Sequence, residues 1–206
     1  SNFAGLGVEG LEFAGPIDIR ATMTTGARAR RDFLACSRTA AIPSTYSASA
    51  RALVPPAAGL SIGPGDDAAI VAREGGLLAA TTDMLVEGRH FRRDWSTGAD
   101  VGVKSAAQNL IDVAVMGART TTLVVALGLP ADLPVDWVTD FYSGLRAEAG
   151  AQGAAIVGGD VVRSDRVVIS VTAIGEMLGP DPVLRSGAEP GDVVAVAGRL
   201  GWAAAG

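Results

Sequence analysis

Two hydroxyls and a carboxylate stand together in this sequence, in the stretch Thr81-Thr82-Asp83, directly after the apolar run Leu77-Leu78-Ala79-Ala80. Further acids lie beside glycine or inside apolar stretches, namely Asp66-Asp67, Asp112 and Asp160. A carboxylate in such surroundings is costly unless it has a partner. Structural pairing would explain one such acid. For the whole set we expect a hard-cation site, because hard cations prefer oxygen ligands.

These residue types disfavour a zinc centre and favour phosphate chemistry. Zinc sites use cysteine and histidine, and this chain has one of each. Mg²⁺ takes one or two protein carboxylates and completes its shell with water and phosphate oxygens. Several carboxylates therefore indicate several ions that bridge a polyphosphate. Such a site transfers a phosphoryl group by positioning and charge neutralisation, with no protein nucleophile.

Glycine-rich stretches accompany two of the acids, at Gly63-Pro64-Gly65 and at Gly158-Gly159. We expect turns there, whose backbone amides approach a phosphate closely. Each stretch alone is equally typical of an ordinary turn. The sequence contains no P-loop pattern and no G-x-G-x-x-G after a strand, so a nucleotide site here belongs to neither class.

A helix over residues 98–116 is predicted to present one of the acids. Thr97 and Asp100 fit a capping box at its start, and Gly117 fits its stop. Three polar residues spaced by four and three share one face of this helix: Ser105, Asn109 and Asp112. They form either a polar outer face or part of a buried helix, and the apolar neighbours of Asp112 favour the buried helix.

The remaining patterns alternate between strands and helices. A hairpin turn at 74–76 joins two of the strands, and a stripe of Trp137, Phe141 and Leu145 indicates that the second helix packs on the core. We expect an α+β fold, a mixed or antiparallel sheet with helices packed on one face. The second helix is predicted at 134–151, and strands at 68–72, 77–82, 121–129, 154–157, 166–177 and 192–197.

Composition narrows the class of protein. The chain has 206 residues, of which 49% are hydrophobic, and a net charge of −5 without a basic run, which argues against nucleic acid as a partner. A single cysteine, Cys36, fits a reducing compartment. No apolar run reaches membrane-spanning length and no signal peptide is evident, so we expect a cytoplasmic protein without a membrane partner.

Five stretches together resemble the thiamine-monophosphate kinase family, whose superfamily includes aminoimidazole ribonucleotide synthetase, selenophosphate synthetase and the hydrogenase maturation dehydratase. They follow the family order at about the family spacing, and T-D-x-L-V-E-G-x-H-F is the specific one. The stretches are G-P-G-D-D-A-A-I-V (63–71), T-T-D-M-L-V-E-G-R-H-F (81–91), K-S-A-A-Q-N-L-I-D-V-A-V-M-G-A (104–118), I-V-G-G-D (156–160) and R-S-G-A-E-P-G-D (185–192).

The resemblance implies direct transfer of the γ-phosphate of ATP onto thiamine monophosphate, with several Mg²⁺ ions and with no catalytic side chain. It also implies a homodimer formed by the N-terminal domains, with the ATP sites near the interface. Matching positions assign the metal ligands as Asp67, Thr81, Thr82, Asp83, Asp112 and Asp160. They assign the ATP contacts as Tyr142, Gly159, Asp160 and Arg185, and His90 as the contact to thiamine monophosphate. Without the resemblance, a lone histidine is more often structural.

The same resemblance divides the chain into three parts. Residues 1–57 form an irregular leader without an assignment, 58–180 an N-terminal ATP- and Mg²⁺-binding and dimerisation domain, and 181–206 the start of a truncated C-terminal domain. Two alternatives remain open at this point. The chain is a truncated, non-catalytic nucleotide-binding or dimerisation module, or it belongs to a related ATP-dependent enzyme of the superfamily with another acceptor.

Overall fold

The computed structural model describes residues 58–63 and 66–194. The leader at 1–57, with Cys36, and the end of the chain after 194 lie outside these residues. The described elements are β1 (Leu60–Ile62), β2 (Ala69–Arg73), β3 (Gly76–Val86), α3 (Gly98–Val115), β4 (Ala118–Leu129), α4 (Val135–Ala151), β5 (Ala155–Arg163), β6 (Val168–Met177) and the short 3₁₀ helix η1 (Arg185–Gly187).

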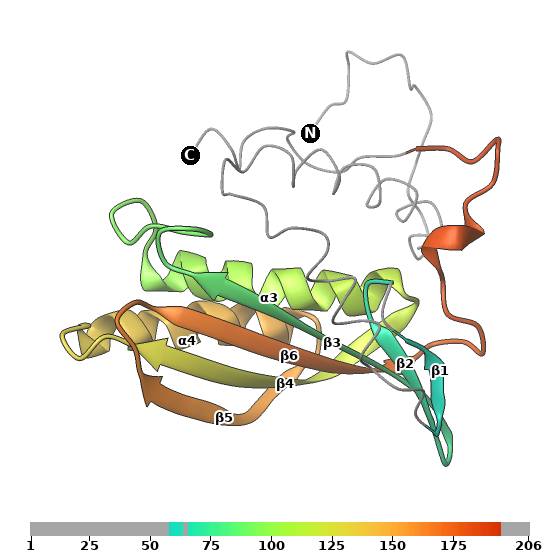
Figure 1. The fold of residues 1–206 in the computed structure, drawn as a ribbon, viewed down its shortest axis with the longest axis horizontal. Coiled ribbons are helices and arrows are strands. Elements are labelled where there is room, and N and C mark those ends of the chain that lie inside the picture. Colours follow the sequence, from blue (N-terminus) through green and yellow to red (C-terminus); the bar gives the residue numbers. More distant parts are fainter. Residues whose placement is uncertain (1–57, 64–65, 195–206) are drawn as a thin grey trace.

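One sheet contains all six of these strands, in the order β1-β2-β3-β6-β4-β5 (Figure 1). Neighbouring strands are antiparallel except β4 and β5, which are parallel. Parallel strands need a crossover connection, and α4 provides it between β4 and β5. The sheet is therefore mixed.

Both helices lie on one face of the sheet (Figure 1). The alternation along β3 shows this division, because successive side chains of a strand point to opposite faces. Ala79 and Leu85 are buried on the helix side, whereas Met84 on the other side is 56% exposed. The predicted α+β class with helices on one face is thus confirmed. None of the described helices is both long and apolar enough to cross a membrane.

The predicted capping box begins α3. The Thr97 side chain accepts a hydrogen bond from the Asp100 amide at 3.2 Å, and the Asp100 carboxylate accepts one from the Thr97 amide at 2.9 Å. The Thr97 hydroxyl also donates to the Asp100 carboxylate at 2.6 Å, and this bond, together with that from the Thr97 amide, lowers the pKa of Asp100. The helix ends at Val115, and Gly117 follows with a φ of +83°, a conformation that favours glycine.

The three polar residues of α3 lie on its buried side, as its apolar surroundings predicted. Ser105, Asn109 and Asp112 are each at most 2% exposed. The expectation that this helix is buried on all sides is nevertheless wrong, because Val103 is 39% exposed and Ile111 is 54% exposed. The described part of the chain places α4 and the sheet against one side of α3 and leaves these two residues uncovered.

Glycines let α3 and α4 approach each other very closely. A side-chain carbon added at Gly102 would lie 2.1 Å from the backbone oxygen of Phe141, and one at Gly144 would lie 2.1 Å from that of Ala99. These distances are far below any van der Waals contact, so the two backbones touch where the glycines stand. The contact fixes the position of α3 relative to the rest of the fold.

An aromatic row fills the space beside this helix contact. The rings of Phe91 and Trp137 are 6.3 Å apart, and those of Trp137 and Phe141 are 6.0 Å apart. Phe141 and Leu145 are completely buried, so the predicted stripe on the second helix packs on the core. Phe91 links the loop after β3 to the same core.

Several strand boundaries differ from the predictions because tertiary pairing overrides local sequence. β3 continues to Val86 and pairs with β6 over nine consecutive positions, so Thr81, Thr82 and Asp83 lie inside the strand and not at its end. The predicted turn at Gly158-Gly159-Asp160 is wrong, because these residues belong to β5 and pair with β4. Glycine signals a turn only where no neighbouring strand offers hydrogen bonds.

Three smaller differences concern the ends of elements. Leu60–Ile62, where no strand was predicted, form β1 and pair with β2. Pro134 is the N-cap of α4, one position before the predicted first turn. Residues 192–194 form no strand, and the rest of the strand predicted at 192–197 lies outside the described residues.

The helix contact can be tested by adding single methyl groups. We expect Gly102→Ala to lower the free energy of unfolding by about 1–3 kcal/mol, because the methyl group has no space against α4. Gly150→Ala is the matched control within α4, where a side-chain carbon would meet nothing within 4 Å. It should raise stability by about 1 kcal/mol. Denaturant unfolding of both variants measures the difference, and equal effects would contradict the close contact.

Candidate functional site

β3 presents its three predicted ligands to opposite faces of the sheet. Thr81 and Asp83 have the parity of the buried Leu85 and point to the helix side. Thr82 points to the open side, where its hydroxyl accepts a hydrogen bond from that of Thr172 on β6 at 3.1 Å. The sequence alone grouped the three residues, whereas the strand separates them.

The first group on the helix side joins β3 to the loop before β2. The Thr81 hydroxyl donates to the backbone oxygen of Asp67 at 3.0 Å. The Asp67 carboxylate accepts a hydrogen bond from the guanidinium of Arg185 at 2.6 Å. The backbone amide of Arg185 donates to the Asp66 carboxylate at 2.9 Å. Three of the predicted site residues are therefore in one cluster, although they are far apart in the sequence.

The second group joins β3 to α3. The backbone amide of Asp83 donates to the side-chain oxygen of Asn109 at 3.1 Å, and the Asn109 amide donates to the backbone oxygen of Ser105 at 3.0 Å. The side-chain amide of Gln108 lies 3.5 Å from the Asp83 carboxylate. α3 therefore holds Asp83 through its backbone and approaches its carboxylate with a weak donor.

Asp112 lies on the same side of α3 as Asn109 and is 2% exposed. A charged group so deeply buried requires compensating partners. Its position one turn after Gln108 and Asn109 places it beside the part of α3 that contacts Asp83. The fold thus brings the helix that carries Asp112 against the strand that carries Asp83.

Asp160 and Gly159 lie elsewhere, on β5. The row of paired residues across the sheet runs from Asp83 through Val171 and Val125 to Gly159. Three strand spacings separate β3 from β5, which amounts to roughly 14 Å. Ligands of one Mg²⁺ lie about 2.1 Å from the ion. Asp160 of this chain therefore cannot share an ion with Asp83 of the same chain.

His90 stands in a tight turn between β3 and α3. Its ring nitrogen Nδ1 accepts a hydrogen bond from the Val86 amide at 2.9 Å, and its backbone oxygen accepts one from the Lys104 ammonium at 2.6 Å. Because Nδ1 is an acceptor, the proton resides on Nε2. Burial lowers the pKa of Lys104. The turn thus fixes the imidazole from one side, and the residue remains exposed.

Tyr142 is half-buried on α4 and meets the ring of Phe141 edge to face at 5.4 Å. Burial raises the pKa of its hydroxyl, so the phenol is neutral at physiological pH. The described residues contain no group of three or more acids, histidines or cysteines positioned to hold one ion. The predicted ligands therefore form separate clusters in a single chain.

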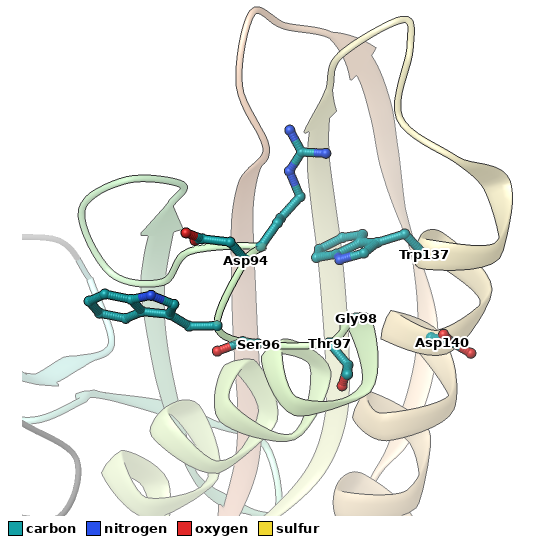
Figure 2. Close-up of a pocket in the computed structure, with 8 residues that line it drawn as sticks. Asp94, Ser96, Thr97, Gly98, Trp137 and Asp140 are labelled. Carbon is teal, nitrogen blue, oxygen red and sulfur yellow. The ribbon is translucent and has the colours of Figure 1, made fainter. Parts of the chain in front are cut away.

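A pocket of about 360 Å³ lies at the other end of α3, between the loop at 93–97 and the start of α4 (Figure 2). Trp137 and Asp140 border it from α4. The indole Nε1 of Trp137 is buried and has no hydrogen-bond partner among the described residues. About 15 helical residues separate this pocket from Asp112, roughly 22 Å, and none of the predicted site residues borders it.

The chain can now be assigned to a protein family. It has a mixed sheet with two helices on one face, and acids on β3 and α3. Residues 65–177 match the AIR synthase related protein, N-terminal domain. This match covers more than half of the chain, and the chain belongs to that family.

Relatives narrow the resemblance to one branch of the family. Thiamine-monophosphate kinase of Mycobacterium tuberculosis is 53% identical over 145 residues, which are 70% of this chain and 44% of the relative. The solved structure of AaThiL complexed with AMPPCP and TMP is 35% identical with a TM-score of 0.57, over 60% of this chain and 39% of that one. Thiamine monophosphate kinase from Aquifex aeolicus is 32% identical with a TM-score of 0.54, over 58% and 39%. The chain thus spans less than half the length of the relatives it matches.

Two side chains at the site escaped the sequence analysis. Gln108 has a recognisable signal, because it precedes Asp112 by four residues and so shares its face of the helix. Lys104 bonds to the backbone of His90, a contact between residues 14 apart in sequence for which the sequence carries no signal. The pairing of Arg185 with Asp67 was equally invisible, since 118 residues separate them.

The glycines of β5 offer a direct test of how this strand is positioned. A side-chain carbon at Gly159 would lie 1.6 Å from the backbone oxygen of Val125, whereas one at Gly158 would meet nothing within 4 Å. We expect Gly159→Ala to detach β5 from β4 and Gly158→Ala to leave the pair intact. Amide hydrogen exchange of β5 should show faster exchange only in Gly159→Ala. Equal protection in both variants would refute the close approach.

Proposed function

We propose that this chain is the nucleotide- and cation-binding portion of a cytoplasmic ATP-dependent kinase that converts thiamine monophosphate to thiamine diphosphate. The observation that carries the proposal is the 53% identity to a thiamine-monophosphate kinase over 145 residues. The structure named AaThiL complexed with AMPPCP and TMP supports the same pair of substrates.

The donor set fits a hard divalent cation. The proposed ligands Asp67, Thr81, Thr82, Asp83, Asp112 and Asp160 offer carboxylate and hydroxyl oxygens only, which suits Mg²⁺. The side-chain carbonyl oxygen of Gln108 lies buried beside Asp83, and in the part of the chain that the structure describes it has no hydrogen-bond partner, so it is a further acceptor. Mg²⁺ at these positions would neutralise phosphate charge and orient the two phosphorylated substrates.

Arg185 is positioned to respond to both ligands. In the free chain its guanidinium neutralises Asp67, while its backbone amide on Asp66 holds η1 in place. A cation at Asp67 competes with this ion pair and releases the guanidinium, which can then bind a nucleotide phosphate in bidentate fashion. The backbone bond keeps Arg185 beside the site during this exchange.

A homodimer would bring ligands of two chains together on the face of the sheet opposite the helices. Asp160 on β5 lies three strand spacings, roughly 14 Å, from Asp83 on β3, too far for one ion to join them within one chain. The sheet face opposite the helices carries the exposed Met84 and the hydroxyls of Thr82 and Thr172. A second copy of this chain packed on that face would cover it and bring another Asp160 toward Thr82 of β3. We therefore assign the nucleotide site to the neighbourhood of this interface.

Calorimetric titration of the 206-residue chain with an ATP analogue, with and without Mg²⁺, tests the proposal. We expect binding that depends on Mg²⁺, and we expect Asp83→Asn to abolish it while the protein stays folded, because the carboxylate is a proposed ligand. Asp132→Asn, which makes the same charge change in an exposed loop, should bind normally. Normal binding of Mg²⁺ and nucleotide by Asp83→Asn would contradict the metal assignment.

His90 should distinguish the two substrates. Its proton-bearing Nε2 is available for an anionic acceptor, so we expect His90→Ala to weaken thiamine monophosphate binding about tenfold. Binding of the ATP analogue should change far less. Arg89→Ala, a change at the neighbouring exposed residue, is the control. A loss that is equal for both substrates would count against a role in acceptor binding.

A further inference from the structure

Gln108 combines two features that do not belong to an ordinary core residue. Its side-chain oxygen Oε1 is buried and has no hydrogen-bond partner among residues 58–63 and 66–194, and its side-chain nitrogen reaches the Asp83 carboxylate only at 3.5 Å. A buried carbonyl that lacks a partner destabilises the folded chain, and a hydrogen bond at that length returns little. A contribution to the stability of the folded chain therefore does not explain a glutamine at this position.

The neighbouring Asn109 provides the contrast. Its oxygen accepts from the backbone amide of Asp83 at 3.1 Å and its nitrogen donates to the backbone oxygen of Ser105 at 3.0 Å. Asn109 is thus satisfied at both ends and holds the strand against the helix. Gln108 is adjacent on the same helix, yet within the described part of the chain its oxygen has no partner and its nitrogen makes only a long hydrogen bond of 3.5 Å to Asp83. The contact between β3 and α3 that Asn109 makes therefore does not require Gln108.

The place of Gln108 indicates what its oxygen is for. The residue contacts Asp83 and precedes Asp112 by four positions, so the two side chains on α3 are about 5–6 Å apart at their β-carbons. Its carboxamide therefore lies between the strand and the helix that carry two proposed cation ligands. Amide oxygens of asparagine and glutamine are ordinary ligands of hard cations, either directly or through a bound water.

We infer that Gln108 is a further ligand of the divalent cation at Asp83 and Asp112, with Oε1 as the contributing oxygen. This inference rests on the proposed function, which supplies the cation. In the free chain the carboxamide turns its nitrogen to the negative carboxylate of Asp83. When a cation occupies that carboxylate, rotation about the terminal torsion presents the oxygen instead. That torsion is broad and two-fold, so the rotation meets no steric barrier of its own.

A series of three side chains of similar size tests this role, with Mn²⁺ alone as the probe. Gln108→Met removes the amide, and Gln108→Glu replaces it with a second carboxylate beside Asp83. For cation affinity, measured by electron paramagnetic resonance, we expect Glu above Gln above Met, with Met about tenfold weaker than Gln. For thermal stability in EDTA, we expect the reverse order, with Met above the wild type by about 2–4 °C.

Opposite orders of cation affinity and thermal stability distinguish a cation ligand from a residue that only packs. A purely structural glutamine would give the wild type the highest stability in EDTA and equal Mn²⁺ affinity in all three proteins, and that result would overturn the inference. Gln152→Met, the same change at the exposed end of α4, should leave both quantities unchanged. If the wild type binds no Mn²⁺, the proposed cation site fails as well, whereas equal affinities at a functioning site overturn only the role of Gln108.

Discussion

The fold depends on how closely α3 lies against its neighbours. Gly102 and Gly144 remove the side chains that would hold α3 and α4 apart, and Gly175 on β6 leaves no space for a side chain beneath Val113. This close contact determines where α3 lies over the sheet. All polar side chains that reach β3 from the helix layer, Asn109 and Gln108 among them, depend on that position. Glycines, which have no side chain of their own, therefore determine the geometry of the candidate site.

Local sequence signals predicted the helices well. Thr97 and Asp100 form the capping box that their spacing indicated, and the apolar neighbours of Asp112 correctly indicated its burial. Strand details were less predictable because they depend on pairing across the chain. Gly158 and Gly159 indicated a turn, but β4 supplies a partner strand and draws them into the sheet. The sequence alone indicated which acids are candidate ligands. It did not indicate that they are distributed over two faces of the sheet and over separate strands.

Nitrogen donors of the chain lie on three of the carboxylates that we propose as cation ligands. The guanidinium of Arg185 lies on Asp67, the amide of Gln108 approaches Asp83, and the Asp160 carboxylate accepts the neighbouring amide of Val161 at 2.9 Å. Acids gathered for a cation repel each other when it is absent, and such donors reduce that repulsion. The three contacts differ in strength, because only the arginine forms an ion pair. Under the proposed function, cation binding would replace these internal partners of the carboxylates with the ion.

The contacts of Arg185 with Asp66 and Asp67 have a consequence for the order in which the domain assembles during synthesis. The paired residues are 118 positions apart, and a ribosome adds roughly 5–20 residues per second. Arg185 is therefore added to the growing chain roughly 6–24 seconds after Asp67. The last strand, β6, ends at Met177, shortly before Arg185, so every strand of the sheet has been made when Arg185 is added. The acidic loop is thus one of the last parts of this domain to reach its final arrangement, after the scaffold that carries it.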